Sequence, residues 1–220
     1  MKTNGATLFM ETLIDEGVKC IFGNPGTTEL PLMDALVNED RLQYYLCLHE
    51  SVAVAAAEGY AFATGEVGIV NVHVAPGLGN AMGNLYNAKR AGSPLVVTAG
   101  NQGQPGHFHE IILWDDLPRI AEPLTKWAYE VRDVRDLEHA VRRAIKVALT
   151  PPTGPVFLSL PGDVLQTPTG GITGSPTRIP TRFPAAAEAI ERAAKLLTEA
   201  KNPVLVTGQG IARSGAQDEL

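Results

Sequence analysis

Several residue types and patterns that mark specialised proteins are scarce in this chain. Its 220 residues include only 2 cysteines and 6% aromatic residues, and no apolar run approaches the length of about 18 residues that a membrane-spanning helix needs. Glu11, Asp15 and Glu16 interrupt the N-terminal segment, which argues against a secretory signal peptide. The formal net charge is −6 and basic residues are adjacent only in pairs, so we do not expect a nucleic-acid partner, because phosphate binding needs clustered cations.

The two cysteines lie in short apolar runs. Cys20 falls within residues 18–22 and Cys47 within residues 44–48. A free cysteine in such a run behaves as a small buried hydrophobe, and unpaired thiols are typical of a reducing compartment. We therefore expect two buried, unpaired cysteines in a cytoplasmic protein, and neither a disulfide nor a metal pair.

Apolar residues make up 45% of the chain, enough for a large core, and they follow two alternating periods. Short apolar runs typical of strands occur at residues 19–22, 44–48, 68–72, 94–99, 127–131 and 156–159. Helical periodicity occurs at residues 5–16, 29–36, 51–64, 81–91, about 111–120 and 136–150. Strands that alternate with helices predict an α/β fold with an open, mainly parallel sheet and helices on both faces.

The pattern changes after residue 165. Residues 166–184 are rich in proline, glycine and threonine and lack apolar periodicity, which predicts a linker after a domain of residues 1–165. Residues 185–220 contain one predicted helix (185–200) and one predicted strand (203–207), too little to bury an apolar face. We expect them to be the truncated beginning of a second α/β domain.

A glycine-rich segment follows the predicted strand 68–72, where parallel sheets often bind phosphates. Gly77, Gly79 and Gly83 have the spacing GxGxxxG, one residue longer than the dinucleotide fingerprint. Residues 67–109 contain no Asp or Glu that could hold a ribose hydroxyl, so a Rossmann-like nucleotide module is a remote alternative. The purely structural explanation of the glycines is a tight turn before the helix 81–91.

Glu50 ends one predicted strand and begins the next predicted helix. A carboxylate at this position has a structural explanation, since it interacts favourably with the helix dipole. It would also lie at the carboxyl edge of the sheet, where open α/β sheets bind ligands. The residues that follow are mostly Ala and Val, so we expect apolar surroundings for this acid.

Four motifs in this order carry a family resemblance. They are residues 23–31 (GNPGTTELP), residues 49–51 (HES) with 57–61 (AEGYA), residues 71–73 (NVH) with 77–83 (GLGNAMG), and residues 93–100 (SPLVVTAG). With these motifs the chain resembles the N-terminal, pyrimidine-binding domain of thiamine-diphosphate-dependent 2-keto-acid enzymes. The most similar pattern is that of benzoylformate decarboxylases, followed by acetolactate synthases.

The resemblance implies roles for individual residues. Glu50 matches the family glutamate that hydrogen-bonds N1′ of the cofactor's aminopyrimidine and thereby promotes loss of the thiazolium C2 proton. His73 matches a histidine that handles protons around the substrate in benzoylformate decarboxylases and that acetolactate synthases usually lack. Thr27 matches a substrate-contacting serine, and its added methyl group puts an identical substrate pocket in question. The cofactor-binding set that the resemblance implies is Pro25, Gly26, Glu50, His73 and Asn80.

His107 and His109 have the spacing of a metal-binding pair, but Glu110 is the only further candidate ligand nearby. Their loop position favours solvated or substrate-facing histidines, and we expect no metal site on this chain. The resemblance assigns Mg²⁺ and the diphosphate to a C-terminal domain with a Gly-Asp-Gly motif. Residues 162–164 (GDV) lack the second glycine of that motif.

The resemblance therefore implies the N-terminal part of a thiamine-diphosphate-dependent decarboxylase or carboligase that acts on a 2-keto acid. In such an enzyme, a homodimer or homotetramer, the C-terminal domain of a second subunit completes the site, so this chain alone would be inactive. Two alternatives stay open. One is an acetolactate-synthase-like enzyme, and the other is a pyrimidine-domain subunit that needs a separate diphosphate-binding chain.

Overall fold

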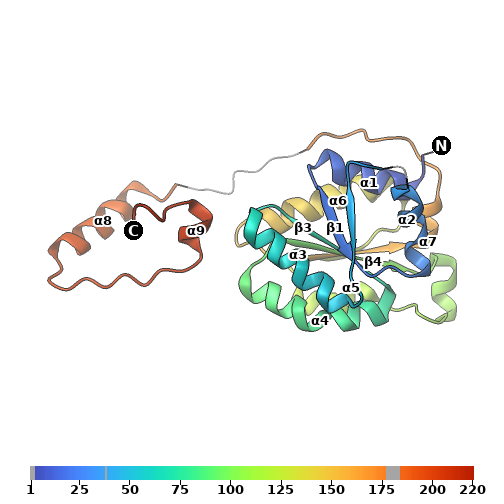
Figure 1. Cartoon of the computed structure of the whole chain (residues 1–220), viewed down its shortest axis with the longest axis horizontal. Coiled ribbons are helices and arrows are strands. Elements are labelled where there is room, and N and C mark those ends of the chain that lie inside the picture. Colours follow the sequence, from blue (N-terminus) through green and yellow to red (C-terminus); the bar gives the residue numbers. More distant parts are fainter. Residues whose placement is uncertain (1–2, 38, 177–183) are drawn as a thin grey trace. The chain divides into compact units, whose positions relative to one another are not determined.

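The computed structural model describes residues 3–37, 39–176 and 184–220. The chain divides into two compact units, Met1–Ile179 and Pro180–Leu220 (Figure 1). None of the helices in the described ranges is long and apolar enough to cross a membrane.

The first unit is built on one six-stranded sheet. Its strands are β1 (Cys20–Gly23), β2 (Gln43–Leu46), β3 (Gly68–Val72), β4 (Leu95–Asn101), β5 (Ala128–Glu130) and β6 (Val156–Pro161). Their order across the sheet is β2-β1-β3-β4-β6-β5, and all neighbouring pairs are parallel. The predicted α/β class with an open parallel sheet is confirmed.

Helices cover both faces of this sheet (Figure 1). One apolar core lies under α1 (Gly5–Asp15), α2 (Leu30–Leu36), α6 (Val134–Leu149) and α7 (Gly162–Gln166), and the other lies under α3 (Glu50–Thr64), α4 (Val74–Ala91) and α5 (Leu117–Ala121). Successive strand residues point to opposite faces, so Ile69 of β3 belongs to the first core and Val70 to the second. Short 3₁₀ helices occupy Thr27–Glu29, Gln104–His109 and Glu122–Leu124.

The strand β2 lies at an edge of the sheet and pairs only with β1. Its side chains are therefore less buried than its apolar sequence suggests, and Leu46 is 65% exposed. Cys20 on β1 is buried as expected, whereas Cys47 is only half-buried, which corrects the prediction that both would be enclosed. Both thiols are free.

The start of α4 differs most from the sequence-based expectation. This helix begins at Val74 and not near Ala81, so Gly77, Gly79 and Gly83 lie inside it and do not form a turn. Each glycine disfavours the helix by about 1 kcal/mol relative to alanine. A helical stripe of buried residues outweighs that loss: Val74, Leu78, Ala81, Leu85 and Ala88.

Two further elements were predicted wrongly. Of the helix expected at about 111–120, only the shorter α5 forms, and residues 111–116 are turn and irregular. In the second unit, which contains α8 (Ala187–Glu199) and α9 (Gly210–Ser214), the strand expected at 203–207 is irregular. Val204 and Val206 there are 84% and 95% exposed, because a strand without a pairing partner gains neither a hydrogen-bond ladder nor an apolar cover.

The predicted linker comprises residues 166–184, and its first part is hydrogen-bonded to α6 of the first unit. The buried carboxylate of Glu138 on α6 accepts hydrogen bonds from the backbone N–H groups of Thr173 and Gly174, at 3.0 and 2.8 Å. Arg142 donates to the same carboxylate and to Glu16 of the α1 end. Ordered contacts thus continue to residue 174, and residues 177–183 of this range lie outside the described part.

These contacts predict how the stability of the first unit depends on pH. Burial raises the pKa of Glu138, but the hydrogen bonds from Thr173, Gly174 and Arg142 outweigh burial and hold it at about 2. A carboxyl whose pKa is depressed in the folded state stabilises it above the unfolded pKa, near 4.3. That stabilisation should disappear as the pH falls from about 4.3 to about 2.

Urea denaturation at a series of pH values tests this prediction. In this acid range the free energy of unfolding should fall more steeply for the wild type than for Glu138→Gln. Glu122→Gln, which changes an exposed glutamate, is the control and should follow the wild type. Equal slopes for Glu138→Gln and the wild type would contradict the proposed role of the Glu138 contacts.

Candidate functional site

The order of the strands creates a topological switch point at the carboxyl edge of the sheet. β2 and β3, which follow β1 in the chain, lie on opposite sides of it, so the connections after β1 and β3 diverge. Ligands of open α/β sheets bind at such a switch point. Three polar residues follow the strands that meet there: Asn24 after β1, Glu50 after β2 and His73 after β3.

Glu50 is the first residue of α3 and is only 6% exposed. The Asn24 Nδ2 amide donates to its Oε1 at 3.1 Å, and the Asn80 Nδ2 amide donates to its Oε2 at 3.0 Å. The expectation of apolar surroundings is therefore wrong, because two amides replace water around the carboxylate. Each carboxylate oxygen keeps a further lone-pair direction for a ligand.

Packing of α3 against α4 places Asn80 beside Glu50. The Asn84 Nδ2 amide donates to both the carbonyl and the hydroxyl oxygen of Ser51, at 2.8 and 2.9 Å. Residues four apart share one face of a helix, so this bond at Asn84 aligns Asn80 with the start of α3. On the first turn of α4, Gly77 packs closely against the acid, because an added Cβ would lie only 3.1 Å from Glu50 Oε1.

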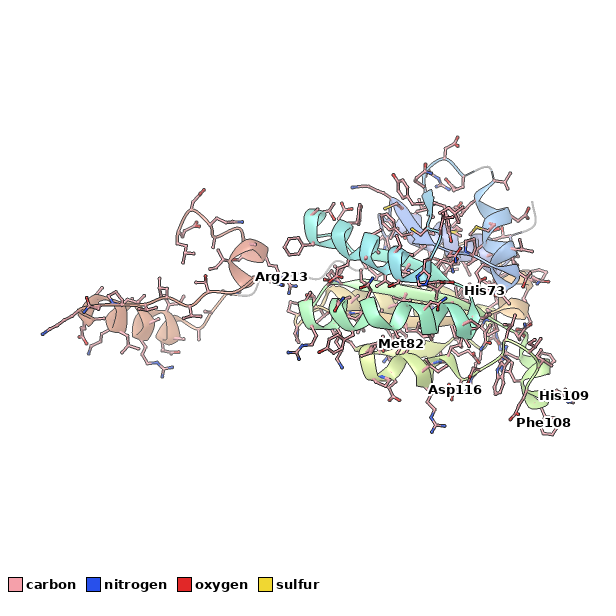
Figure 2. All side chains as sticks on the ribbon, turned by 60° about the horizontal axis from the view of Figure 1, so that its bottom comes forward. His73, Met82, Phe108, His109, Asp116 and Arg213 are labelled. Carbon is pink, nitrogen blue, oxygen red and sulfur yellow. The ribbon has the colours of Figure 1, made fainter. Side chains whose placement is uncertain are left out.

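His73 is the single residue between β3 and α4 (Figure 2). Its Nδ1 lies 2.7 Å from Oε2 of Glu29, and its side chain is 24% exposed. The next residue, the buried Val74, has a φ of 42°, which is a strained value for a β-branched residue. Strain of this kind costs about 1–3 kcal/mol and is maintained by the surrounding packing, so the bend that carries His73 is rigidly determined.

The turn after β1 packs against His73. A Cβ at Gly26 would overlap the His73 ring, so only glycine fits between this turn and the imidazole. Pro25 is partly buried, whereas Thr27 is exposed at the start of the short helix Thr27–Glu29. The structure therefore groups Gly26 with His73 and Asn80 with Glu50, all at the carboxyl edge.

Two residues of this edge were not singled out from the sequence. Asn24 stands directly after β1, and a polar residue at the carboxyl end of a central strand is a usable signal. Glu29 is fully buried and contacts His73, but the residues around it in the sequence do not indicate that this acid is buried. Only the folded chain brings Glu29 to β3.

His107 and His109 lie elsewhere. His107 Nε2 is 2.7 Å from the Gln102 carbonyl oxygen, and its ring packs on Trp114, so this histidine anchors its loop. Phe108 and His109 are exposed and point away from His73 (Figure 2). Within the described residues, no group of three or more His, Cys, Asp or Glu side chains could hold a metal ion.

Substitutions at the two close-packed glycines should differ in their effect on stability. In Gly26→Ala the methyl group overlaps the held His73 ring, so we expect a loss of about 1–3 kcal/mol in the free energy of unfolding. In Gly77→Ala the neighbour needs to move only slightly and the helix gains propensity, so we expect little change or a gain. Urea denaturation measures both values, and equal stability of the two variants would contradict the packing described for Gly26.

Comparison with known proteins gives this edge a family context. Residues 3–110 match the family model described as thiamine pyrophosphate enzyme, N-terminal TPP binding domain, where TPP is another name for thiamine diphosphate. Over 209 residues the chain is 38% identical to benzoylformate decarboxylase of Pseudomonas aeruginosa. The alignment covers 94% of this chain and 39% of that protein. The large subunit of acetolactate synthase from Lactococcus lactis is 36% identical over 219 residues, 98% of this chain and 38% of that subunit.

A solved structure agrees in fold. The crystal structure of benzoylformate decarboxylase from Polynucleobacter necessarius superposes with a TM-score of 0.91 at 33% identity, over 98% of this chain and 40% of that chain. The chain thus spans about two fifths of the length of the curated relatives it matches. Residues 3–110 thus match the N-terminal TPP-binding domain of thiamine pyrophosphate enzymes.

Proposed function

We propose that this chain is the N-terminal part of a thiamine-diphosphate-dependent decarboxylase or carboligase that acts on a 2-keto acid. One observation carries the proposal: two amides hold the nearly buried Glu50 carboxylate at the switch point. None of the ion pairs among the described residues includes Glu50. An acid in this state can share a proton with a ring nitrogen of a ligand.

The residues of the edge fit the aminopyrimidine ring of the cofactor. The absence of a Cβ at Gly77 lets Glu50 pack against the first turn of α4, and Asn24 and Asn80 fix the direction of its carboxylate plane. A heteroaromatic ring nitrogen can share a hydrogen bond with a carboxylate whose direction is fixed in this way. Pro25, which is partly buried in the turn after β1, would supply an apolar wall for the ring.

When bound, thiamine diphosphate supplies the electron sink that a 2-keto acid needs to lose carbon dioxide. This chain's own residues orient the aminopyrimidine and manage protons. Glu50 holds a proton at N1′ of that ring, and its amide partners keep the carboxylate in one orientation. His73, and Thr27 in the exposed turn, would face the substrate, where His73 can accept or deliver a proton.

Further parts of the enzyme are proposed to lie outside this chain. The domain of residues 1–165, a linker at 166–184 and the beginning of a second domain at 185–220 would be followed by a domain that binds the diphosphate and Mg²⁺. Leu48 and Val52 flank Glu50 and are 91% and 55% exposed, which supports an apolar partner at this edge, in a homodimer or homotetramer. The free thiols of Cys20 and Cys47 support a cytoplasmic location.

The proposed proton role of Glu50 predicts a loss of turnover in Glu50→Gln. In the enzyme that includes the diphosphate-binding domain, carbon dioxide release should fall by about 10²–10⁴-fold, because an amide cannot exchange the proton. Both benzoylformate consumption and acetolactate formation should be assayed, since relatives of both kinds match the chain.

Glu58→Gln is the matched control. Glu58 lies on the same helix but contacts Ser93 near the start of β4, so its variant should keep wild-type turnover. Circular dichroism of both variants monitors the fold. Wild-type turnover in Glu50→Gln would overturn the proposed function.

A further inference from the structure

Glu29 is a fully buried carboxylate whose partners come from three separate segments of the chain. The backbone N–H of Gly26 donates to Oε2 at 2.8 Å, and the backbone N–H of Gly100 donates to Oε1 at 2.7 Å. The Thr28 hydroxyl also donates to Oε1, at 2.8 Å. The fourth contact is His73 Nδ1, 2.7 Å from Oε2.

These contacts decide which ring nitrogen of His73 carries hydrogen. Backbone N–H groups can only donate, and they face both oxygens of Glu29, so both oxygens act as acceptors. An ionised carboxylate carries no hydrogen, so Glu29 in that form cannot supply the hydrogen of its contact with His73. Nδ1 of His73 is then the donor, and in the neutral ring Nε2 holds the lone pair. The Thr28 hydroxyl oxygen also lies 3.4 Å from Nδ1, and because its own hydrogen goes to Glu29 it too acts as an acceptor there.

We propose that Glu29 is a positioning residue that holds His73 in its Nδ1–H form, so that Nε2 is the proton-accepting atom presented to the substrate. This inference rests on the proposed function for the identity of the substrate, a 2-keto acid or its reaction product. It assigns to Glu29 a task that the sequence motifs did not indicate.

The arrangement is rigid because backbone groups hold the acid. Gly26 lies in the turn after β1 and Gly100 lies on β4, so the carboxylate spans the switch point from one side of β3 to the other. Its position follows the sheet and does not depend on flexible cationic side chains. The strained bend at Val74 fixes the backbone of His73, and Glu29 fixes its ring.

NMR of the 220-residue chain with ¹⁵N-labelled histidine tests the proposal without any cofactor. Long-range ¹H–¹⁵N spectra at alkaline pH, where imidazole is neutral, report the tautomer of each ring, and His73→Gln identifies the signals of His73. In the wild type the Nδ1–H form should predominate. In Glu29→Gln the ratio of Nδ1–H to Nε2–H should fall about tenfold or more, because a neutral amide replaces a charge-assisted acceptor.

Two further variants make the result specific. Glu29→Asp keeps the carboxylate and should retain more of the Nδ1–H form than Glu29→Gln. Glu130→Gln changes another shielded carboxylate of this sheet, which accepts from Asn101 and Ser159, and should leave the His73 signals unchanged. A wild-type His73 in the Nε2–H form would overturn the inference even if Glu29→Gln failed to fold, and so would an unaltered tautomer ratio in folded Glu29→Gln.

Turnover separates this inference from the proposed function. In the enzyme with its diphosphate-binding domain, Glu29→Gln should lower kcat more than it raises KM and should alter the pH profile of kcat. If Glu50→Gln keeps wild-type turnover while the His73 tautomer responds to Glu29, the proposed function fails and the positioning role stands. If Glu50→Gln loses turnover while Glu29→Gln leaves the His73 tautomer ratio unchanged, the positioning role fails and the proposed function stands.

Discussion

The divergence of the chain on the two sides of β1 is the constraint on which the candidate site depends. In a parallel sheet all carboxyl ends lie at one edge, and the connections from β1 and β3 leave that edge toward opposite faces. The edge therefore opens between α2 on one face and α3 with α4 on the other. Polar residues that end neighbouring strands meet there without being close in sequence.

Buried polar groups at this edge are satisfied by neutral donors. In the described residues every buried side-chain nitrogen or oxygen has a hydrogen-bond partner. Glu50 is held by two amides, and Glu29 by two backbone N–H groups, a hydroxyl and an imidazole. Neutral donors fix the direction of a carboxylate without cancelling its charge, which leaves the charge available to act on a ligand or on a neighbouring ring.

The two carboxylates serve different parts of the same edge. Glu50 lies at the start of α3 next to Gly77 and is 6% exposed, whereas Glu29 is fully buried. A buried acid with no access to solvent cannot exchange protons with a substrate directly. Its effect has to pass through His73, which contacts Glu29 and has a partly exposed side chain.

Local patterns in the sequence determined the alternation of strands and helices, and hence the parallel α/β class and the place of Glu50 and His73 at strand ends. The motifs added the family, because their order is specific. Tertiary packing decided the rest: burial of Val74, Leu78 and Leu85 extended α4 through glycines that locally favour a turn. Glu29 became a partner of His73 only because strand pairing joins segments 44 residues apart, which no local pattern encodes.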